Sequence, residues 1–89
     1  MEYVLAVFSV RTDTVQFNRI LNSNYIKSSV VETPKSASAS CGISVKFMVK
    51  DLPKVKELMG KTKPKSFVRF YLVTGFYGNI KLTPIKWYK

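Results

Sequence analysis

The chain has 89 residues, of which 46% are hydrophobic, and it carries a formal net charge of +10. This length and apolar content predict one folded domain over residues 1–89 and exclude a disordered polypeptide. With no histidine and a single cysteine, the sequence argues against histidine-based catalysis, a metal site and an intramolecular disulfide, so we expect no ordinary hydrolase, no cofactor and a cytoplasmic address.

The first predicted elements are a strand and a helix. Residues 3–10 (YVLAVFSV) form an apolar run rich in β-formers, which is typical of a central strand. We expect Ser9 or Thr12 to cap the helix that follows and residues 22–24 to end it. Spacings of four, three and one residues predict its core face, which carries Val10, Thr14, Phe17, Ile20 and Leu21.

Two strands joined by a loop come next. Residues 25–32 (YIKSSVVE) are less apolar than the first strand, which favours a strand at a sheet edge. A loop of proline, serine and alanine runs from Thr33 to Gly42. Residues 43–49 then alternate apolar and polar side chains, which predicts a strand with one apolar face.

A second helix and two C-terminal strands complete the pattern. We expect Asp51 to cap the helix, Pro53 to lie in its first turn and Gly60 to end it. A strand is predicted over residues 67–74 and a turn over residues 75–78. Pro84 confines a last strand over residues 79–86 to an edge. The core face of the helix carries Leu52, Val55, Leu58 and Met59.

The order β-α-β-β-α-β predicts an α+β chain of the ferredoxin-like class. We expect an antiparallel four-stranded sheet with two helices on one face and an additional C-terminal edge strand as an option. The first strand is apolar on both sides, so the sheet face opposite the two helices also needs a cover. Either the C-terminal segment with Ile85, Trp87 and Tyr88 folds over it, or two copies form a homodimer there.

The positive charge is concentrated in the second half of the chain. Residues 1–45 carry four basic and three acidic side chains, whereas residues 46–89 carry eleven basic and two acidic ones. Such asymmetry indicates an anionic partner, although a solvated face that maintains solubility is an equal alternative. The excess lies in Lys46, Lys50, Lys54, Lys56, Lys61, Lys63, Lys65 and Arg69.

Cys41 ends a loop of very small residues at the start of a predicted strand. Small neighbours leave a sulfur approachable, and a thiolate needs a nearby cation for stabilisation. Lys35 is the better candidate, because Lys46 lies five residues along the strand, roughly 16 Å away at about 3.3 Å per residue. The alternative is that Cys41 packs as an inert small hydrophobe.

The block from Thr33 to Phe47, TPKSASASCGISVKF, resembles a pattern of the selenium/sulfur carrier protein-like family, a group of small bacterial proteins. The resemblance covers roughly residues 3–60, and Ala39 interrupts its serine run. It implies a carrier that passes sulfur or selenium as a persulfide or selenenylsulfide on Cys41. Lys35, Ser40, Gly42 and Lys46 would then serve as binding residues, and the partner would be a donor or acceptor protein thiol with an acidic surface.

Three other functions compete with the carrier. A nucleic-acid-binding module would use the basic half for phosphates and stack bases on aromatics, but its basic-Gly-aromatic run is absent from the third strand. A second alternative is a catalytically inactive subunit that dimerises through the open sheet face. An enzyme that acts on phosphate groups is the least favoured of the three. No apolar run spans a membrane, and Glu2 replaces the basic start of a signal peptide. The stacking candidates are Tyr3, Phe47, Phe70 and Tyr71.

Overall fold

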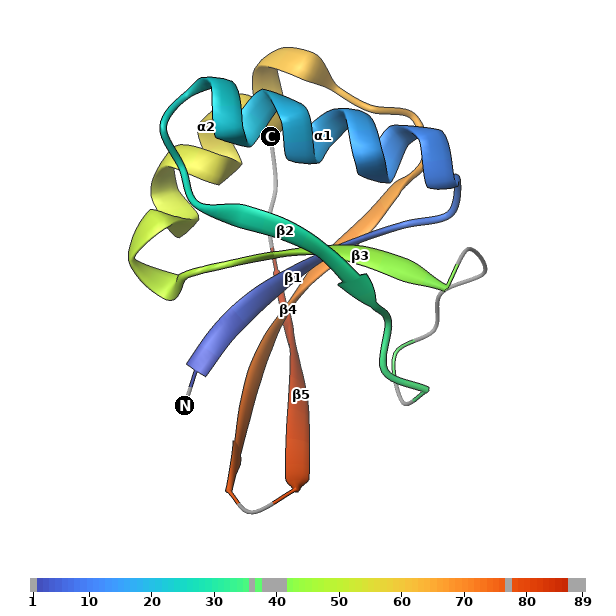
Figure 1. Cartoon of the computed structure of the whole chain (residues 1–89), viewed down its shortest axis with the longest axis vertical. Helices are drawn as coiled ribbons and strands as arrows, with labels where there is room; N and C mark the ends of the chain where they lie inside the picture. The colour runs from blue at the N-terminus through green and yellow to red at the C-terminus, as the bar shows by residue number, and fades with distance from the viewer. Residues whose placement is uncertain (1, 36, 38–41, 77, 87–89) are drawn as a thin grey trace.

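The computed structural model describes residues 2–35, 37, 42–76 and 78–86, with only the backbone of Phe76 (Figure 1). The predicted α+β class is confirmed. None of the described helices is long and apolar enough to cross a membrane. The elements are β1 (Glu2–Phe8), α1 (Arg11–Ser23), β2 (Ser28–Glu32), β3 (Ile43–Phe47), a short 3-10 helix η1 (Val49–Asp51), α2 (Leu52–Thr62), β4 (Phe67–Phe76) and β5 (Asn79–Ile85).

The strands form one antiparallel sheet in the order β2-β3-β1-β4-β5. As expected, β1 is central and β2 lies at an edge. The sheet has five strands rather than four, because β5 pairs with β4 from Asn79 to Ile85. Pro84 lies in this edge strand, where its missing N–H costs no ladder hydrogen bond.

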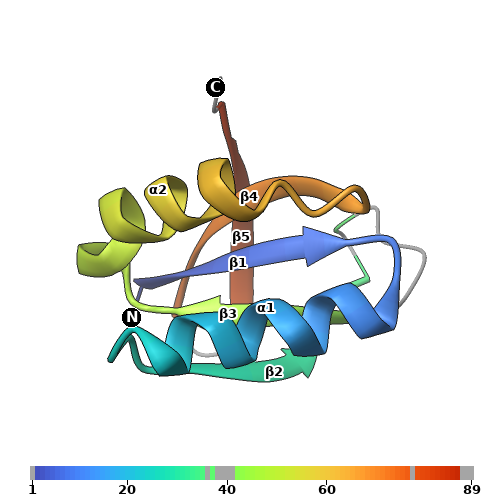
Figure 2. The same cartoon turned by 90° about the horizontal axis from the view of Figure 1, so that it is seen from above.

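Both helices cover the same face of the sheet, as predicted (Figure 2). Alternate residues of β1, namely Val4, Ala6 and Phe8, point into the core beneath them. Five phenylalanines form four edge-on or tilted ring pairs, with ring centroids 4.9–6.0 Å apart. The buried members of this helix-side core are Val4, Ala6, Phe8, Phe17, Leu21, Ile26, Val45, Phe47, Val55, Leu58, Met59 and Phe70.

The start of α1 corrects the predicted caps. The N-cap residue is Val10, whose side chain cannot accept a hydrogen bond, and Val10 is exposed instead of facing the core. The Ser9 hydroxyl instead donates to the carbonyl of Ser66, 3.3 Å away. The expectation for α2 is met more closely: Asp51 is the N-cap residue and Pro53 lies in the first turn, although the Asp51 side chain makes no capping hydrogen bond.

The end of α1 explains why β2 is shorter than predicted. Tyr25 has a left-handed backbone with φ 61°, and its N–H donates to the carbonyl of Asn22. The N–H of Ile26 donates to the carbonyl of Leu21, and the Ile26 side chain is buried in the helix-side core. These bonds satisfy the last carbonyls of the helix, so Tyr25 and Ile26 belong to its C-terminal cap. The strand begins only at Ser28.

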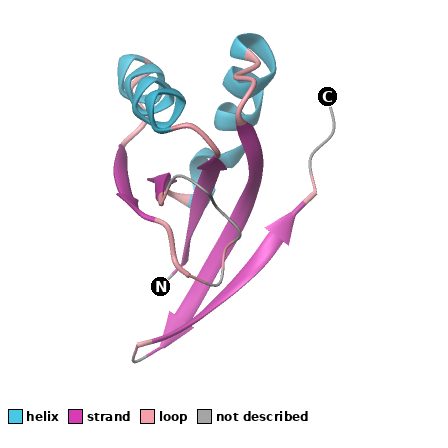
Figure 3. Cartoon of the chain, turned by 90° about the vertical axis from the view of Figure 1, so that its right-hand side faces the viewer, coloured by secondary structure: helices cyan, strands magenta, loops and turns pink. Residues whose placement is uncertain are grey.

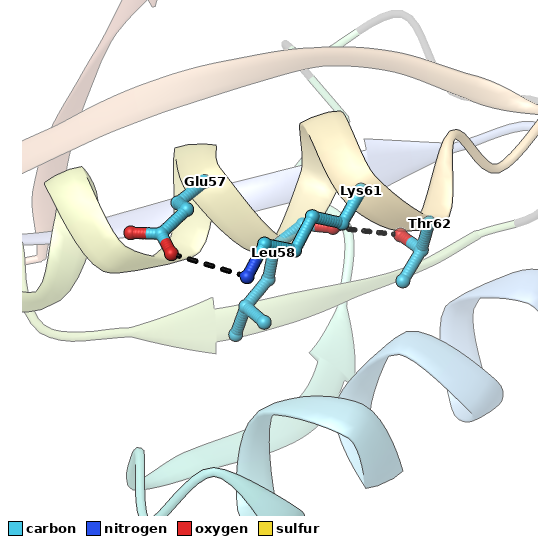
Figure 4. Close-up of polar contacts among 4 residues, drawn as sticks. All are labelled: Glu57, Leu58, Lys61 and Thr62. Carbon is cyan, nitrogen blue, oxygen red and sulfur yellow. Dashed lines mark hydrogen bonds and ion pairs between the residues drawn. The ribbon is translucent and has the colours of Figure 1, made fainter.

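The prediction that Gly60 ends α2 was wrong. The helix continues through Thr62, and the Thr62 hydroxyl donates to the carbonyl of Leu58 at 3.0 Å (Figure 4). It ends at Lys63, which adopts a left-handed conformation with φ 45°. Pro64 follows, and a proline disfavours the helical region for the residue before it. A glycine permits a helix to stop, but here the proline enforces it.

Two strand boundaries also differ from the prediction. β3 ends at Phe47 instead of residue 49, because Val49 already belongs to η1. β4 extends to Phe76 and includes Gly75, which was assigned to the turn. The connection to β5 is therefore only residues 77 and 78. At Gly75 a Cβ atom would collide with the carbonyl oxygen of Asn79, so the absence of a side chain is what permits the pairing there.

The burial of side chains on α1 predicts that substitutions at two nearby positions have very different effects on the free energy of unfolding. Phe17 is fully buried, whereas Val15 is 40% exposed on the same helix. We expect Phe17→Ala to lower the free energy of unfolding by about 3–5 kcal/mol, because it removes a ring from the core and leaves a cavity. Val15→Ala should change it by less than about 0.5 kcal/mol. Urea unfolding followed by circular dichroism measures both; equal effects would contradict the assigned core.

Candidate functional site

The sheet face without helices is also apolar and buried at its centre. Leu5 and Val7 of β1 point to this side, between the helix-side positions of the same strand. Across β4, Tyr71 pairs with Leu5, and Val73 lies two residues further along. All four side chains have at most 8% of their surface exposed. Something other than a helix must therefore cover them.

The cover is the loop between β2 and β3. Ala37 is only 5% exposed and packs in one cluster with the four buried side chains of this face. In Figure 3 both helices lie at the top, and the pink segment that follows β2 runs away from them. Ile85 points to the helix side, because it pairs with Phe70, and Trp87 and Tyr88 lie outside the described residues. The expectation that Ile85 helps to cover the free face was wrong.

Hydrogen bonds close the base of this loop. The N–H of Thr33 donates to the carbonyl of Gly42 at 2.9 Å, which extends the β2–β3 ladder by one step. The hydroxyls of Thr33 and Ser44 share a hydrogen bond at 2.5 Å, and Ser44 is completely buried. A turn places the N–H of Ala37 3.0 Å from the carbonyl of Pro34. The loop is thus fixed at its base and at Ala37.

Gly42 connects the loop to β3 through a left-handed backbone with φ 79°. A Cβ at this position would meet no atom within 4 Å. The requirement for glycine is therefore conformational and not a matter of space. Gly42 is exposed.

The structure describes three of the five predicted site residues, namely Lys35, Gly42 and Lys46. Ser40 and Cys41 lie outside the described residues, and Lys35 is exposed in the loop. Lys46 is four positions beyond Gly42, about 13 Å at roughly 3.3 Å per residue. Its ammonium lies 4.4 Å from the centroid of the Tyr3 ring, a cation–π contact at the far end of the face. Of the two lysines, Lys35 is thus the one that the fold keeps in the loop.

Arg69 is a residue near the loop for which the sequence suggested no individual role. It pairs with Val7 across the β1–β4 ladder and is exposed on the helix-free face. Because Val7 belongs to the cluster that contains Ala37, Arg69 lies on the face that the loop covers. Only the register of β1 against β4 reveals this, since the two residues are far apart in the chain.

The structure does not favour base stacking by the sheet aromatics. Phe47 and Phe70 belong to the helix-side core and are at most 2% exposed. Tyr71 is covered from the other side, and Lys46 lies over Tyr3. Stacking platforms need open aromatic faces. Within the described residues, no group of three or more cysteine and acidic side chains is placed to hold a metal ion.

The family model "Putative Se/S carrier protein-like" matches residues 3–68, about three quarters of the chain. The match begins in β1, contains the anchored loop with Cys41 and ends at the start of β4. The chain belongs to this family. The resemblance seen in the sequence is therefore confirmed and extends beyond residue 60. Comparisons with curated proteins and with solved structures found no match.

Membership in the Se/S carrier protein-like family is consistent with a sulfur-carrier role and implies contact with partner proteins. The matched range includes both helices and the base of the loop, whereas β5 lies wholly outside it. The part of the fold that the family shares thus contains the loop and the hydrogen bonds at its base.

The anchoring of the loop gives a testable prediction. Ala37→Asp places a carboxylate against apolar side chains, so we expect the loop to leave the sheet and the free energy of unfolding to fall by about 1–2 kcal/mol. Hydrogen exchange of the Thr33 amide should accelerate at least about tenfold, because its bond to Gly42 depends on the loop.

Lys35→Asp is the matched control, since it places the same carboxylate at an exposed position of the same loop. It should change the free energy of unfolding by less than about 0.5 kcal/mol. An unchanged Thr33 exchange rate in Ala37→Asp would show that Ala37 does not hold the loop.

Proposed function

We propose that this protein is a small thiol-based carrier that accepts and passes on a sulfur or selenium atom on Cys41. The supporting observation is the family match across the loop that contains Cys41. We also propose that the carrier is a ferredoxin-like fold extended by β5: its first six main elements follow β-α-β-β-α-β, with β1 and β3 adjacent in the sheet.

The proposed transfer is a thiolate exchange that needs no cofactor. The Cys41 thiolate attacks the terminal sulfur of a donor cysteine persulfide, a new S–S bond forms on Cys41, and the donor leaves as a thiolate. The terminal sulfur keeps its proton, and no net oxidation occurs. Selenium transfers in the same way from a donor selenenylsulfide to give a selenenylsulfide on Cys41. A second exchange passes the atom to an acceptor thiolate.

The fold contributes the position of the loop. The Thr33–Gly42 bond and the buried Ala37 fix two points of a loop otherwise built from small residues. Neither helix covers the described part of the loop, since both helices are on the other face of the sheet (Figure 2). Lys35 supplies a nearby positive charge that favours the thiolate, and Gly42 leaves access for the partner's cysteine.

Reaction with glutathione persulfide tests the carrier function. Mass spectrometry of the folded protein should show an adduct of about 32 Da, one sulfur atom, that a reductant removes. With a selenium donor the adduct should be about 79 Da. Cys41→Ser should show neither adduct.

Because any free thiol exchanges slowly, the decisive comparison is the same chain unfolded in urea. We expect the folded protein to take up sulfur at least about tenfold faster than the unfolded chain, because the fold favours the thiolate and leaves it accessible. An equal or slower rate in the folded protein would contradict the carrier function and indicate a cysteine that merely packs.

A further inference from the structure

One end of the sheet brings together segments that are distant in the sequence. β1 ends at Phe8 and pairs there with Phe67, the first residue of β4, while Val7 pairs with Ser44 near the start of β3. The start of α1, the loop between β2 and β3, and the linker from α2 to β4 therefore meet at this end. Figure 1 shows all three on its right-hand side.

Exposed cations surround this end, and we call four of them the loop-end cations: Arg11, Lys35, Lys65 and Arg69. Arg11 is the first residue of α1, and Lys35 lies in the loop itself. Lys65 lies in the linker. The linker is held against the start of α1 because the Ser9 N–H donates to the carbonyl of Ser66 at 2.8 Å. Arg69 emerges on the helix-free face beside Val7.

The positive charges of the loop-end cations are not neutralised by ion pairs with the described carboxylates. No ion pair joins a loop-end cation to a carboxylate of the described residues, whereas Lys61 on α2 lies 3.4 Å from Glu57 (Figure 4). Asp13, the acidic residue nearest to Arg11 along α1, accepts a hydrogen bond from the Ser66 hydroxyl at 2.6 Å. Glu32 is the other carboxylate at this end, and it alternates away from the helix-free face on which Arg69 lies.

We propose that the loop-end cations form the docking surface for an acidic face of the protein that donates or accepts the transferred atom. This inference rests on the proposed function. The exchange reaction requires the partner's cysteine to reach the loop. Because salt screening limits the range of an exposed charge to about 8 Å at physiological ionic strength, the charges that can orient the partner electrostatically are those around the loop. Three of the four aromatics suggested for stacking, Phe47, Phe70 and Tyr71, are buried, which favours a protein partner over a nucleic acid.

Peptides that carry a reporter disulfide test this surface without knowledge of the natural partner. Each peptide has one cysteine joined to 5-thio-2-nitrobenzoate and flanked by four glutamates or by four glutamines. Attack by the Cys41 thiolate forms a protein–peptide disulfide and releases the coloured thiolate. At low salt we expect the glutamate peptide to react about tenfold faster, an advantage that 0.5 M NaCl removes.

Position, not net charge, is tested by two matched variants. Lys35→Glu/Lys65→Glu/Arg69→Glu should abolish the preference for the glutamate peptide. The variant Lys27→Glu/Lys50→Glu/Lys54→Glu changes the net charge by the same amount, but at the other end of the strands. It should retain at least half of the preference for the glutamate peptide. An equal loss in both variants, or no preference in the unaltered protein, would overturn the docking surface.

Two further readouts separate the alternatives. Salt-sensitive binding of single-stranded RNA that only the loop-end variant loses would overturn the proposal in favour of a nucleic-acid partner. The glutamine peptide reports on the thiol alone. If the glutamine peptide reacts no faster with the folded protein than with the chain in urea, the carrier function is contradicted. If it reacts faster with the folded protein but the glutamate peptide has no advantage over it, only the docking surface is contradicted.

Discussion

The structure depends on the covering of both faces of β1. This central strand buries every side chain from Val4 to Phe8, which is possible only if the sheet is covered on each side. Two helices supply the cover on one side, with a core of aromatic and aliphatic residues. On the other side a short loop supplies it through Ala37. Burial of a small apolar group yields little free energy, about 1 kcal/mol, so this cover is the weaker of the two.

That asymmetry connects the fold to the proposed chemistry. A reactive thiol must be reachable, which a helix packed over a core would prevent. A loop held at its base by Thr33 and Gly42, and at one further point by Ala37, instead lies at the surface of the sheet. The same end of the sheet carries Arg11, Lys35, Lys65 and Arg69. We therefore regard the loop and its surrounding charges as one functional unit.

The sequence predicted the order of elements because hydrophobic periodicity reports directly on burial. The alternation in residues 43–47 and the helical spacing of Thr14, Phe17 and Leu21 both appear in the structure. Element ends were less predictable, since Tyr25 and Lys63 adopt left-handed conformations that only local hydrogen bonds and a following proline explain. Ala37 and Arg69 were not identifiable, because a lone alanine among serines has no period and a cross-strand pair has no local signal.

The fold and the proposed chemistry both require that the loop rests on the helix-free face through Ala37. Nuclear Overhauser effects of the Ala37 methyl group in the folded protein test it most directly, because they arise only between protons that are close in space. We expect contacts from this methyl to Leu5, Val7 and the Tyr71 ring. A methyl group with solvent contacts alone, and none to these three residues, would contradict it.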